Sequence, residues 1–244
     1  MNRLLNNIFE TKKFINGSGE CIQIHSETSK EQCEFLQKII RENRFIKSIE
    51  IGFAYGISTL AIVEQIANNQ GNHIVIDKFQ HNYWNGNGLD LVKQAGYLAH
   101  LRFIEEYSYI ALPALLQKGE KFDFAYIDTT KLFDWVLVDF FYIDKLLETN
   151  GIIVFDDVPV PAIRKLLRYI VQLPNYSICG QFPENYPLSK LYSAAKMIKI
   201  FPKSSKYIKS EVIQTDFDLG INTSCLAIKK TGDDKRYYDW HVNF

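Results

Sequence analysis

The sequence predicts an α/β fold built around one mostly parallel sheet, and two observations support this prediction. From residue 28 to residue 175, strand-like runs of about five residues alternate with helix-like stretches of about 10 to 15. The runs HIVID, FAYID and IIVFD are almost wholly apolar, as strands covered on both faces must be. This alternation is typical of βαβ crossovers in a doubly wound sheet.

The elements follow in a regular order. A first helix is predicted to begin at the capping pattern Thr28-x-x-Glu31 and to end near residue 44. Strands are predicted at 46–53, 72–79, 101–107, 122–128 and 151–157. Helices are predicted at 58–69, 88–98, 111–119, 133–147 and 161–173. After residue 175 the alternation stops, and YSICGQF and NTSCLAIKK predict a terminal antiparallel pair of strands.

We expect one domain over residues 1–244. It divides into a lead-in (1–27), which is irregular or partly helical, a core (28–180), a lid (181–215), and a last strand with a tail (216–244). The lid is predicted because long loops in compact domains are commonly functional. Its Tyr186 and Tyr192, and Trp240 of the tail, are candidates for contact with a substrate.

Composition narrows the class of protein. The formal net charge is zero, with 28 basic and 28 acidic residues, and no basic stripe is evident, which disfavours a nucleic-acid partner. No apolar run approaches the roughly 18 to 20 residues that span a bilayer, so no membrane association is expected. The four cysteines show no CxxC pattern and are expected to be core residues of a reduced, cytoplasmic protein.

The loop after the first strand of the core has the pattern E-x-G-x-x-x-G-x-S, formed by Glu50, Gly52, Gly56 and Ser58. Glycines permit a tight turn and a close approach of a ligand to the backbone. The first glycine of a dinucleotide fingerprint is replaced here by Glu50, which suits a cationic ligand and opposes a pyrophosphate. Asp77, which ends the next strand, can accept hydrogen bonds from ribose hydroxyls. Each feature has an ordinary structural explanation, but together they favour an S-adenosylmethionine site.

The segments IEIGFAYGISTLAI, VIDKFQHNYWNGNGLDLVKQAGY and FDFAYIDTTKLFDWVLVDFFYIDKLLETNGIIVFDDV resemble class I S-adenosylmethionine-dependent methyltransferases. The nearest subgroup is that of bacterial O-methyltransferases similar to the catechol and caffeoyl-CoA enzymes. The resemblance covers about residues 30–175. It implies a Rossmann-like, doubly wound, mostly parallel seven-stranded sheet with an antiparallel C-terminal strand and a lid insertion. The cofactor-binding residues that it implies are Glu50, Gly52, Ala54, Tyr55, Gly56, Ser58, Asp77, Ser108 and Asp128.

Three aspartates follow two neighbouring strands, namely Asp128 after one and Asp156 with Asp157 after the next. The resemblance implies that they hold Mg²⁺ or Ca²⁺, for which carboxylate oxygens are suitable ligands. It also implies that Lys131 is the general base, with Asp128 beside it. The alternatives are an Asp-Asp pair that caps the next helix and a lysine exposed in a turn. Asp134 and Asp139, on the helix that follows, are expected to be solvated or capping.

The predicted function is S-adenosylmethionine-dependent O-methylation (EC 2.1.1.-) of a small hydroxylated molecule. A nicotinamide-dependent oxidoreductase and a non-catalytic adenosylmethionine-binding protein are the alternatives. Relatives of this kind are often dimers, so a homodimer is left open. Thr129 and Thr130 stand where catechol-type enzymes have larger residues beside the adenine, so the resemblance assigns them no contact.

Overall fold

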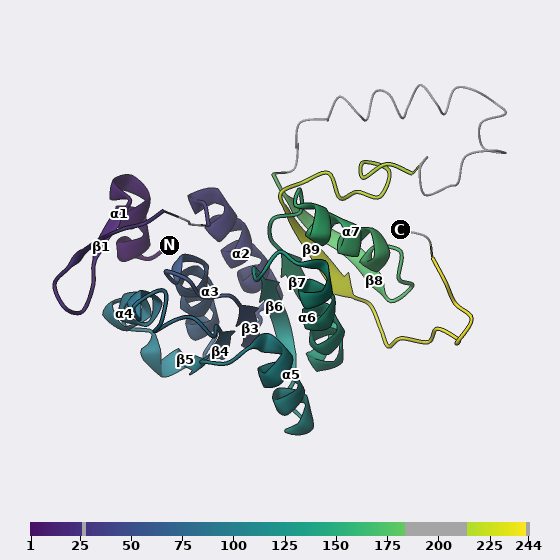
Figure 1. The fold of residues 1–244 in the computed structure, drawn as a ribbon, viewed down its shortest axis with the longest axis horizontal. Coiled ribbons are helices and arrows are strands. Elements are labelled where there is room, and N and C mark those ends of the chain that lie inside the picture. Colours follow the sequence, from purple (N-terminus) through teal and green to yellow (C-terminus); the bar gives the residue numbers. More distant parts are fainter. Residues whose placement is uncertain (26–27, 184–213, 243–244) are drawn as a thin grey trace.

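The computed structural model describes residues 1–25, 28–183 and 214–242. Its main sheet has seven strands in the order β5-β4-β3-β6-β7-β9-β8. The strands are β3 (Lys47–Ile51), β4 (Asn72–Ile76), β5 (Leu101–Ile104), β6 (Phe122–Ile127), β7 (Leu147–Phe155), β8 (Tyr176–Phe182) and β9 (Cys225–Lys230). β9 is antiparallel to both of its neighbours, and the five strands from β3 to β7 are parallel (Figure 1). The predicted fold class is therefore confirmed.

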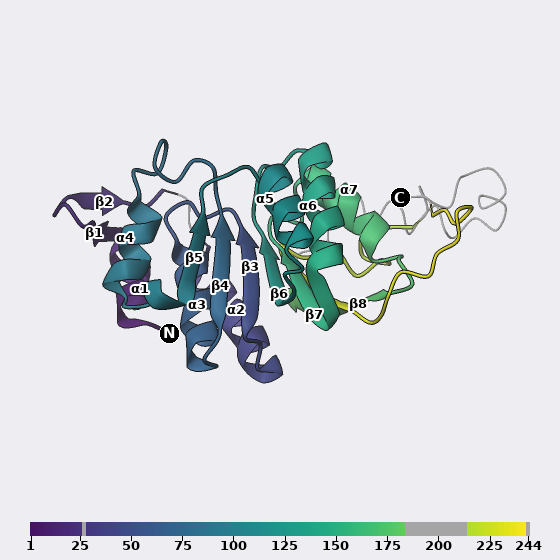
Figure 2. The ribbon, with the colours of Figure 1, turned by 90° about the horizontal axis from the view of Figure 1, so that it is seen from below.

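Helices cover both faces of this sheet (Figure 2). On one face lie α2 (Lys30–Asn43), α3 (Ile57–Asn68) and α4 (Asn87–Gln94). On the other lie α5 (Ser108–Gln117), α6 (Phe133–Leu146) and α7 (Pro161–Ile170). A short 3-10 helix, η1 (Leu98–His100), precedes β5. Every predicted core helix and strand is present, with shifts of a few residues at its ends.

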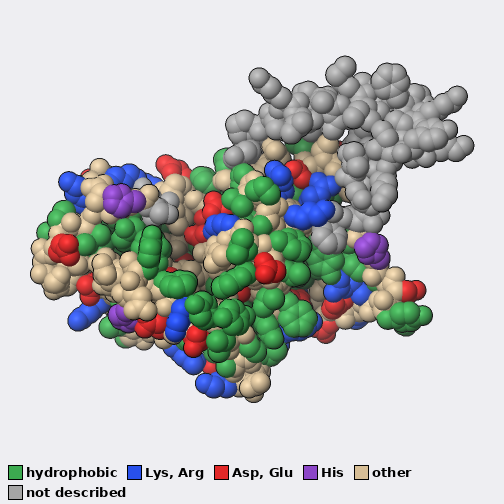
Figure 3. Space-filling model, viewed as in Figure 1, with side chains coloured by type: hydrophobic (Ala, Val, Ile, Leu, Met, Phe, Trp, Pro, Cys, Tyr) green, Lys and Arg blue, Asp and Glu red, His purple; other side chains and the backbone are tan. Residues whose placement is uncertain are grey.

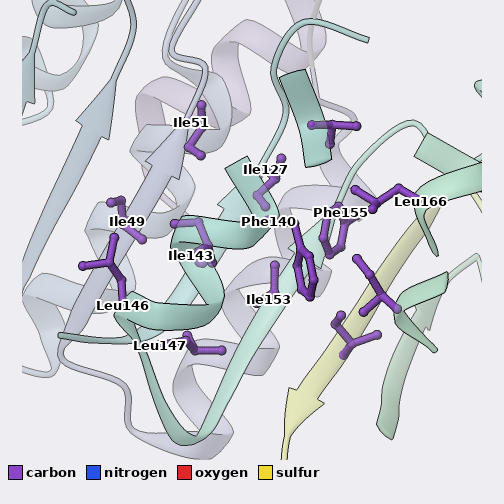
Figure 4. Packing of buried hydrophobic residues seen from close by; sticks show 14 of the residues in the cluster. Ile49, Ile51, Ile127, Phe140, Ile143, Leu146, Leu147, Ile153, Phe155 and Leu166 are labelled. Carbon is purple, nitrogen blue, oxygen red and sulfur yellow. The ribbon is translucent and has the colours of Figure 1, made fainter. Parts of the chain in front are cut away.

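The largest buried cluster lies between the sheet and α5, α6 and α7 (Figure 4). Side chains of a strand alternate between its two faces, so Ile49 and Ile51 of β3 join this cluster, whereas Ser48 and Glu50 point to the opposite face, towards α3. Helix α6 contributes Phe140 and Ile143. Burial of each such side chain stabilises the fold by about 1.5–3 kcal/mol. The same alternation decides which polar residues end up beneath the cofactor loop.

The predicted cap of the first core helix is shifted by one residue. Ser29, not Thr28, is the N-cap of α2, and its side chain accepts a hydrogen bond from the backbone N–H of Gln32 at 3.2 Å. The sequence Ser29-x-x-Gln32 fits the capping-box pattern as well as Thr28-x-x-Glu31 does. Gln32 does not return to the cap, however, because its amide donates to Asp156 in the cavity described below.

The lead-in is more ordered than the sequence predicts. Helix α1 (Arg3–Thr11) buries Leu5 and Ile8, and a hairpin of β1 (Lys13–Ile15) and β2 (Cys21–Gln23) follows it. The side chain of Asn16 accepts hydrogen bonds from the backbone N–H groups of Ser18 and Glu20, which closes the turn. The NGSGE segment signalled this turn, but strands of three residues are too short to give a periodicity.

Most of the predicted lid lies outside the described residues, including Tyr186 and Tyr192. The described part of the tail docks on this chain: the Arg236 guanidinium donates to the Tyr169 hydroxyl of α7 at 2.5 Å, and Trp240 packs against the same ring. The cysteine prediction is half correct, since Cys33 and Cys225 are buried while Cys21 and Cys179 are exposed. Within the described residues no helix is long and apolar enough to cross a membrane.

Candidate active site

A cavity of about 480 Å³ lies beyond the carboxyl ends of β3, β4, β6 and β7. Its position follows from the strand order, because β3 has β4 on one side and β6 on the other, and ligands of doubly wound sheets bind where the chain switches direction. Its volume is within the range of about 300–1,000 Å³ that is usual for small-molecule sites. All of the predicted cofactor, metal and catalytic residues except Glu50 line it.

The loop between β3 and α3 forms the floor of the cavity. Gly52 has φ +100°, and a Cβ there would lie 2.0 Å from the backbone oxygen of Asp128. Ala54 and Gly56 also have positive φ, so the loop turns tightly before α3 begins. Gly52, Ala54, Tyr55, Gly56 and Ser58 all line the cavity, as predicted positions for a cofactor should. The loop therefore brings backbone and the α3 N-terminus next to any ligand.

Asp77 fixes this loop from the end of β4. Its Oδ2 accepts hydrogen bonds from the backbone N–H groups of Phe53 (3.0 Å) and Ala54 (3.1 Å), and its Oδ1 accepts one from Phe79 (2.7 Å). A carboxylate has about four lone-pair positions, so Oδ1 retains one for a further donor. Asp77 lines the cavity. It can hold the loop and bind a ligand hydroxyl at the same time.

Glu50 does not line the cavity but lies beneath it, fully buried. One carboxylate oxygen accepts from the Ser58 hydroxyl at 2.5 Å, and the other bonds His73 Nε2 at 3.0 Å. His73 Nδ1 in turn bonds the Ser48 hydroxyl at 2.8 Å. This series of hydrogen bonds gives the buried Glu50 carboxylate the partners that it needs. It also orients Ser58, which does line the cavity. Glu50 thus reaches the ligand space only through Ser58.

Aromatic side chains form the wall on the side of Asp77 and Ser108. Phe79 packs edge-on against Tyr107 with ring centroids 5.9 Å apart, and Trp135 packs edge-on against Tyr107 at 6.0 Å. All three line the cavity. Sequence reasoning missed them, although Phe79 follows Asp77 by two residues and Tyr107 precedes Ser108 directly. Trp135 lines the same cavity as Thr129 and Thr130.

Asp139 is a buried acid behind this wall. It is 1% exposed on α6, and within the described residues neither of its carboxylate oxygens has a hydrogen-bond partner. Burial raises the pKa of Asp139 to about 6, and the nearby Ser108 hydroxyl opposes only part of that shift. The expectation that Asp139 is solvated or capping is wrong, because its helical position faces α5 rather than water.

One end of the cavity holds the predicted catalytic pair, Lys131 and Asp128. The Lys131 ammonium contacts Asp128 Oδ1 and lies 3.1 Å from Asp157 Oδ2. Burial lowers the pKa of Lys131, but the two carboxylates outweigh burial and hold the pKa above its ordinary value. Lys131 is therefore a paired cation at the cavity wall and not a lysine exposed in a turn. The raised pKa keeps Lys131 protonated, which disfavours its predicted role as a general base and favours Asp128 as the proton acceptor.

Asp156 faces a different set of partners. Its Oδ1 accepts from the Gln32 amide and from the backbone N–H of Asp157, and its Oδ2 accepts from the Tyr126 hydroxyl at 2.8 Å. Burial and the negative charge of Asp128 raise the pKa of Asp156 to about 6. Among the described residues, no side chain caps helix α7, whose N-cap is Val160, so the aspartate pair does not act as the helix cap that was the alternative.

The three aspartates lie in one cavity but are not arranged as a metal centre. Asp128 and Asp157 share the Lys131 ammonium, and Asp156 accepts from two neutral side-chain donors, Gln32 and Tyr126. In the part of the chain that the structure describes, no group of three acidic, histidine or cysteine side chains is placed to hold a metal ion. Carboxylate oxygens suit a hard cation, but this arrangement of the three aspartates does not fit one.

The charge of the cavity discriminates between ligands. Among the described residues, its lining contains five carboxylates, from Asp77, Glu106, Asp128, Asp156 and Asp157, and two lysines, Lys78 and Lys131. Lys78 lies 3.8 Å from Glu106, and Lys131 is paired as described. The excess of negative charge favours a cationic ligand and disfavours a pyrophosphate, because like charges in a partly desolvated site repel.

Comparisons with known proteins agree with this geometry. A family model described as a methyltransferase domain matches residues 49–158, which include the cofactor loop and all three aspartates. A search of the curated proteins gives no significant match.

Solved structures with the same fold include three methyltransferases. The O-methyltransferase TomG of Streptomyces achromogenes, in complex with S-adenosylmethionine, is 14% identical with TM-score 0.61; the match covers 84% of this chain and 82% of that one. An O-methyltransferase of Bacillus cereus, in complex with S-adenosylhomocysteine, is 18% identical with TM-score 0.60 and coverages of 73% and 83%. The methyltransferase PaMTH1 of Podospora anserina, bound to S-adenosylhomocysteine, is 18% identical with TM-score 0.58 and the same coverages.

At these identities the likeness establishes the shared fold. The family match adds the domain type, and it favours a methyltransferase over the nicotinamide-dependent alternative. Residues 49–158 therefore match a methyltransferase domain, and the chain has the fold of these solved methyltransferases.

Proposed function

We propose that this protein transfers a methyl group from S-adenosylmethionine to a hydroxyl oxygen of a small molecule. The observation that carries the proposal is the acidic cavity at the switch point, where five carboxylates face two lysines. S-adenosylmethionine carries a sulfonium and an ammonium group, which such a cavity stabilises. The oxidoreductase alternative requires a pyrophosphate at the same loop, which these charges oppose.

Different residues of the cavity contact different parts of S-adenosylmethionine. Asp77 Oδ1 accepts a hydrogen bond from a ribose hydroxyl, while the loop from Gly52 to Ser58 contacts the methionine half. Phe79, Tyr107 and Ser108 border the adenine. This division follows the cavity wall, since Asp77 lies between the glycine loop and the aromatic side chains.

When bound, S-adenosylmethionine supplies the methyl group: the acceptor oxygen forms an O–CH₃ bond as the S–CH₃ bond breaks, and sulfur keeps the electron pair. Asp128 and Lys131 act on the acceptor. Asp128 Oδ2, which accepts no hydrogen bond among the described residues, takes the hydroxyl proton. The Lys131 ammonium holds the same oxygen and stabilises the negative charge that develops on it.

The acceptor is a small hydroxylated molecule, and its size is set at this end of the cavity by Thr28, Gln32 and Ser224. The predicted homodimer and the cytoplasmic location stay predictions. A non-catalytic protein of the same fold is separated from an enzyme by a turnover assay. In that assay S-adenosylhomocysteine is measured by chromatography across phenols, vicinal diols and sugars, and binding without product formation would favour the non-catalytic alternative.

The ribose assignment is tested with Asp77→Ala and two ligands. We expect the wild-type protein to bind S-adenosylhomocysteine about 10- to 100-fold more tightly than an analogue without ribose hydroxyls, because a hydrogen bond to a charged group is worth about 1.5–3 kcal/mol. In Asp77→Ala the two ligands should bind almost equally. Isothermal titration calorimetry measures all four affinities.

The comparison of two ligands serves as the control, because loss of the loop contacts at Phe53 and Ala54 weakens both ligands alike. An unchanged preference for the ribose hydroxyls in Asp77→Ala would contradict the assignment.

A further inference from the structure

We propose that Lys131 takes the place of a divalent metal ion in this active site, so that the positive charge beside the methyl acceptor belongs to the chain itself. The inference rests on the proposed function, because it concerns the acceptor end of the same cavity. It predicts a methyltransferase that works without Mg²⁺ or Ca²⁺ and that gains a cation site only when Lys131 is removed.

The first argument is the position of the ammonium. Lys131 Nζ bridges two carboxylates that come from different strands, Asp128 after β6 and Asp157 after β7. A cation that joins the ends of these strands must lie between the same oxygens. Both side chains line the cavity, and Lys131 is 28% exposed there, so its charge faces the ligand space. The lysine thus has the location and the sign of charge of a bound metal.

The second argument is the orientation of the third carboxylate. Asp156 turns both oxygens toward protein donors: Oδ1 toward the Gln32 amide, and Oδ2 toward the fully buried Tyr126 hydroxyl. Oδ1 also accepts from the backbone N–H of Asp157, so both of its lone-pair positions are used, and Oδ2 already holds the Tyr126 proton in a hydrogen bond. Asp156 is therefore tied to the protein frame, and Gln32 on α2 is anchored by it at the cavity wall.

The third argument is the backbone at Asp157. This residue has φ +53°, in the left-handed region, and its N–H donates to Asp156 Oδ1 at 2.8 Å. Left-handed backbone at a residue other than glycine is uncommon, and its cost must be offset by surrounding contacts. Here the conformation directs Asp157 Oδ2 to Lys131 while Asp156 faces away from it. The turn separates the two aspartates instead of converging them on one ion.

The test compares metal binding by the wild-type protein and three variants. Mg²⁺ and Ca²⁺ are titrated separately into chelator-treated protein by isothermal titration calorimetry. We expect no saturable binding by the wild-type protein at millimolar metal. Lys131→Met should gain a saturable site at least 10-fold tighter, because Asp128 and Asp157 lose their cation. Lys131→Arg, which keeps the charge, should not gain it, and Lys131→Met combined with Asp157→Asn should lose it again.

Each other outcome overturns the inference. Stoichiometric Mg²⁺ or Ca²⁺ binding by the wild-type protein would show that the aspartates hold a metal despite Lys131. Absence of binding in Lys131→Met would show that the carboxylates are no latent cation site, so that Lys131 replaces nothing. Circular dichroism of each variant confirms that it is folded before metal is added.

Cofactor binding is the readout that keeps this inference apart from the proposed function. S-adenosylmethionine affinity should be nearly the same in the wild-type protein and in Lys131→Met, because Lys131 lies at the acceptor end. Turnover should fall about 100- to 1,000-fold in Lys131→Met, as when a charge-stabilising donor is removed. If neither the wild-type protein nor any variant binds S-adenosylmethionine, the proposed function fails. If all of them bind it but the metal titrations do not give the results expected above, this inference alone fails.

Discussion

Gly52→Ala is expected to lower the free energy of unfolding by about 2–5 kcal/mol and to abolish cofactor binding. An alanine in the left-handed region costs about 1–2 kcal/mol, and overpacking adds about 1–3 kcal/mol. The overlap is severe because the new Cβ would lie 2.0 Å from the Asp128 backbone oxygen, at the junction of β3 and β6. Urea denaturation followed by circular dichroism measures the loss.

Gly96→Ala is the matched control for this substitution. Gly96 has φ +83°, so alanine meets a similar backbone strain, but no atom lies within 4 Å of its added Cβ. The control should lose only the backbone contribution and should keep full affinity for S-adenosylmethionine. Equal losses of stability in the two variants would contradict the close approach of the Gly52 loop to β6.

Asp139→Asn is expected to raise the free energy of unfolding by about 3 kcal/mol at pH 8, because a shift of one pKa unit corresponds to about 1.4 kcal/mol. The pKa of Asp139 is raised by burial from 3.8 to about 6 in the folded protein. The folded state therefore binds the proton more tightly than the unfolded state, and ionisation above pH 6 destabilises the fold. Asparagine removes this cost.

The stability gained by Asp139→Asn is expected to depend on pH. The difference in stability between Asp139→Asn and the wild-type protein should be fully present above the folded pKa of about 6. It should disappear as the pH falls through the ordinary value of 3.8, where both states are protonated. Urea titrations at several pH values measure the difference. An asparagine variant that is less stable at pH 8 would show that a partner compensates the buried charge.

The fold was predictable because its signals are local and repeated. Strands such as β4 and β6 are short, nearly all apolar and followed by helices with an apolar stripe, so periodicity locates them. The hairpin of β1 and β2 lacked such a signal, since each strand has three residues. Helix α2 offered two overlapping capping patterns, and only the structure separates Ser29 from Thr28.

The positions of site residues were predictable where an acidic residue directly follows a strand. Asp77, Asp128 and Asp156 each follow the last residue of a parallel strand, and such ends meet at one edge of the sheet. Glu50 shows the limit of this reasoning: the pattern places it in the loop, but alternation along β3 turns it toward α3 and away from the cavity. The distinction depends on register and not on the motif.

Other parts of the site depend on contacts between distant segments. Gln32 and Asp156 are 124 residues apart in the sequence, and nothing local indicates that they bond. The aromatic wall likewise joins the segment after β4, the N-cap of α5 and helix α6. Asp139 is a case where a signal existed and was not used, because it shares the buried stripe of α6 with Val136 and Ile143 at helical spacing.

The surface over α5 and α6 is rich in apolar side chains (Figure 3). The exposed members are Tyr109, Ile110, Leu132, Phe133, Leu137, Val138 and Phe141. They lie outside the cavity, so the acidic character of the site is a property of the strand ends and is independent of this surface.

The most direct test of the central claim is calorimetric titration of the wild-type protein with S-adenosylmethionine, with a nicotinamide dinucleotide titrated in parallel. We expect saturable binding of one S-adenosylmethionine per chain and no binding of the dinucleotide, because the acidic cavity stabilises a sulfonium and opposes a pyrophosphate. Binding of the dinucleotide, or the absence of any heat with S-adenosylmethionine, would contradict the assignment of this cavity as a methyl-donor site.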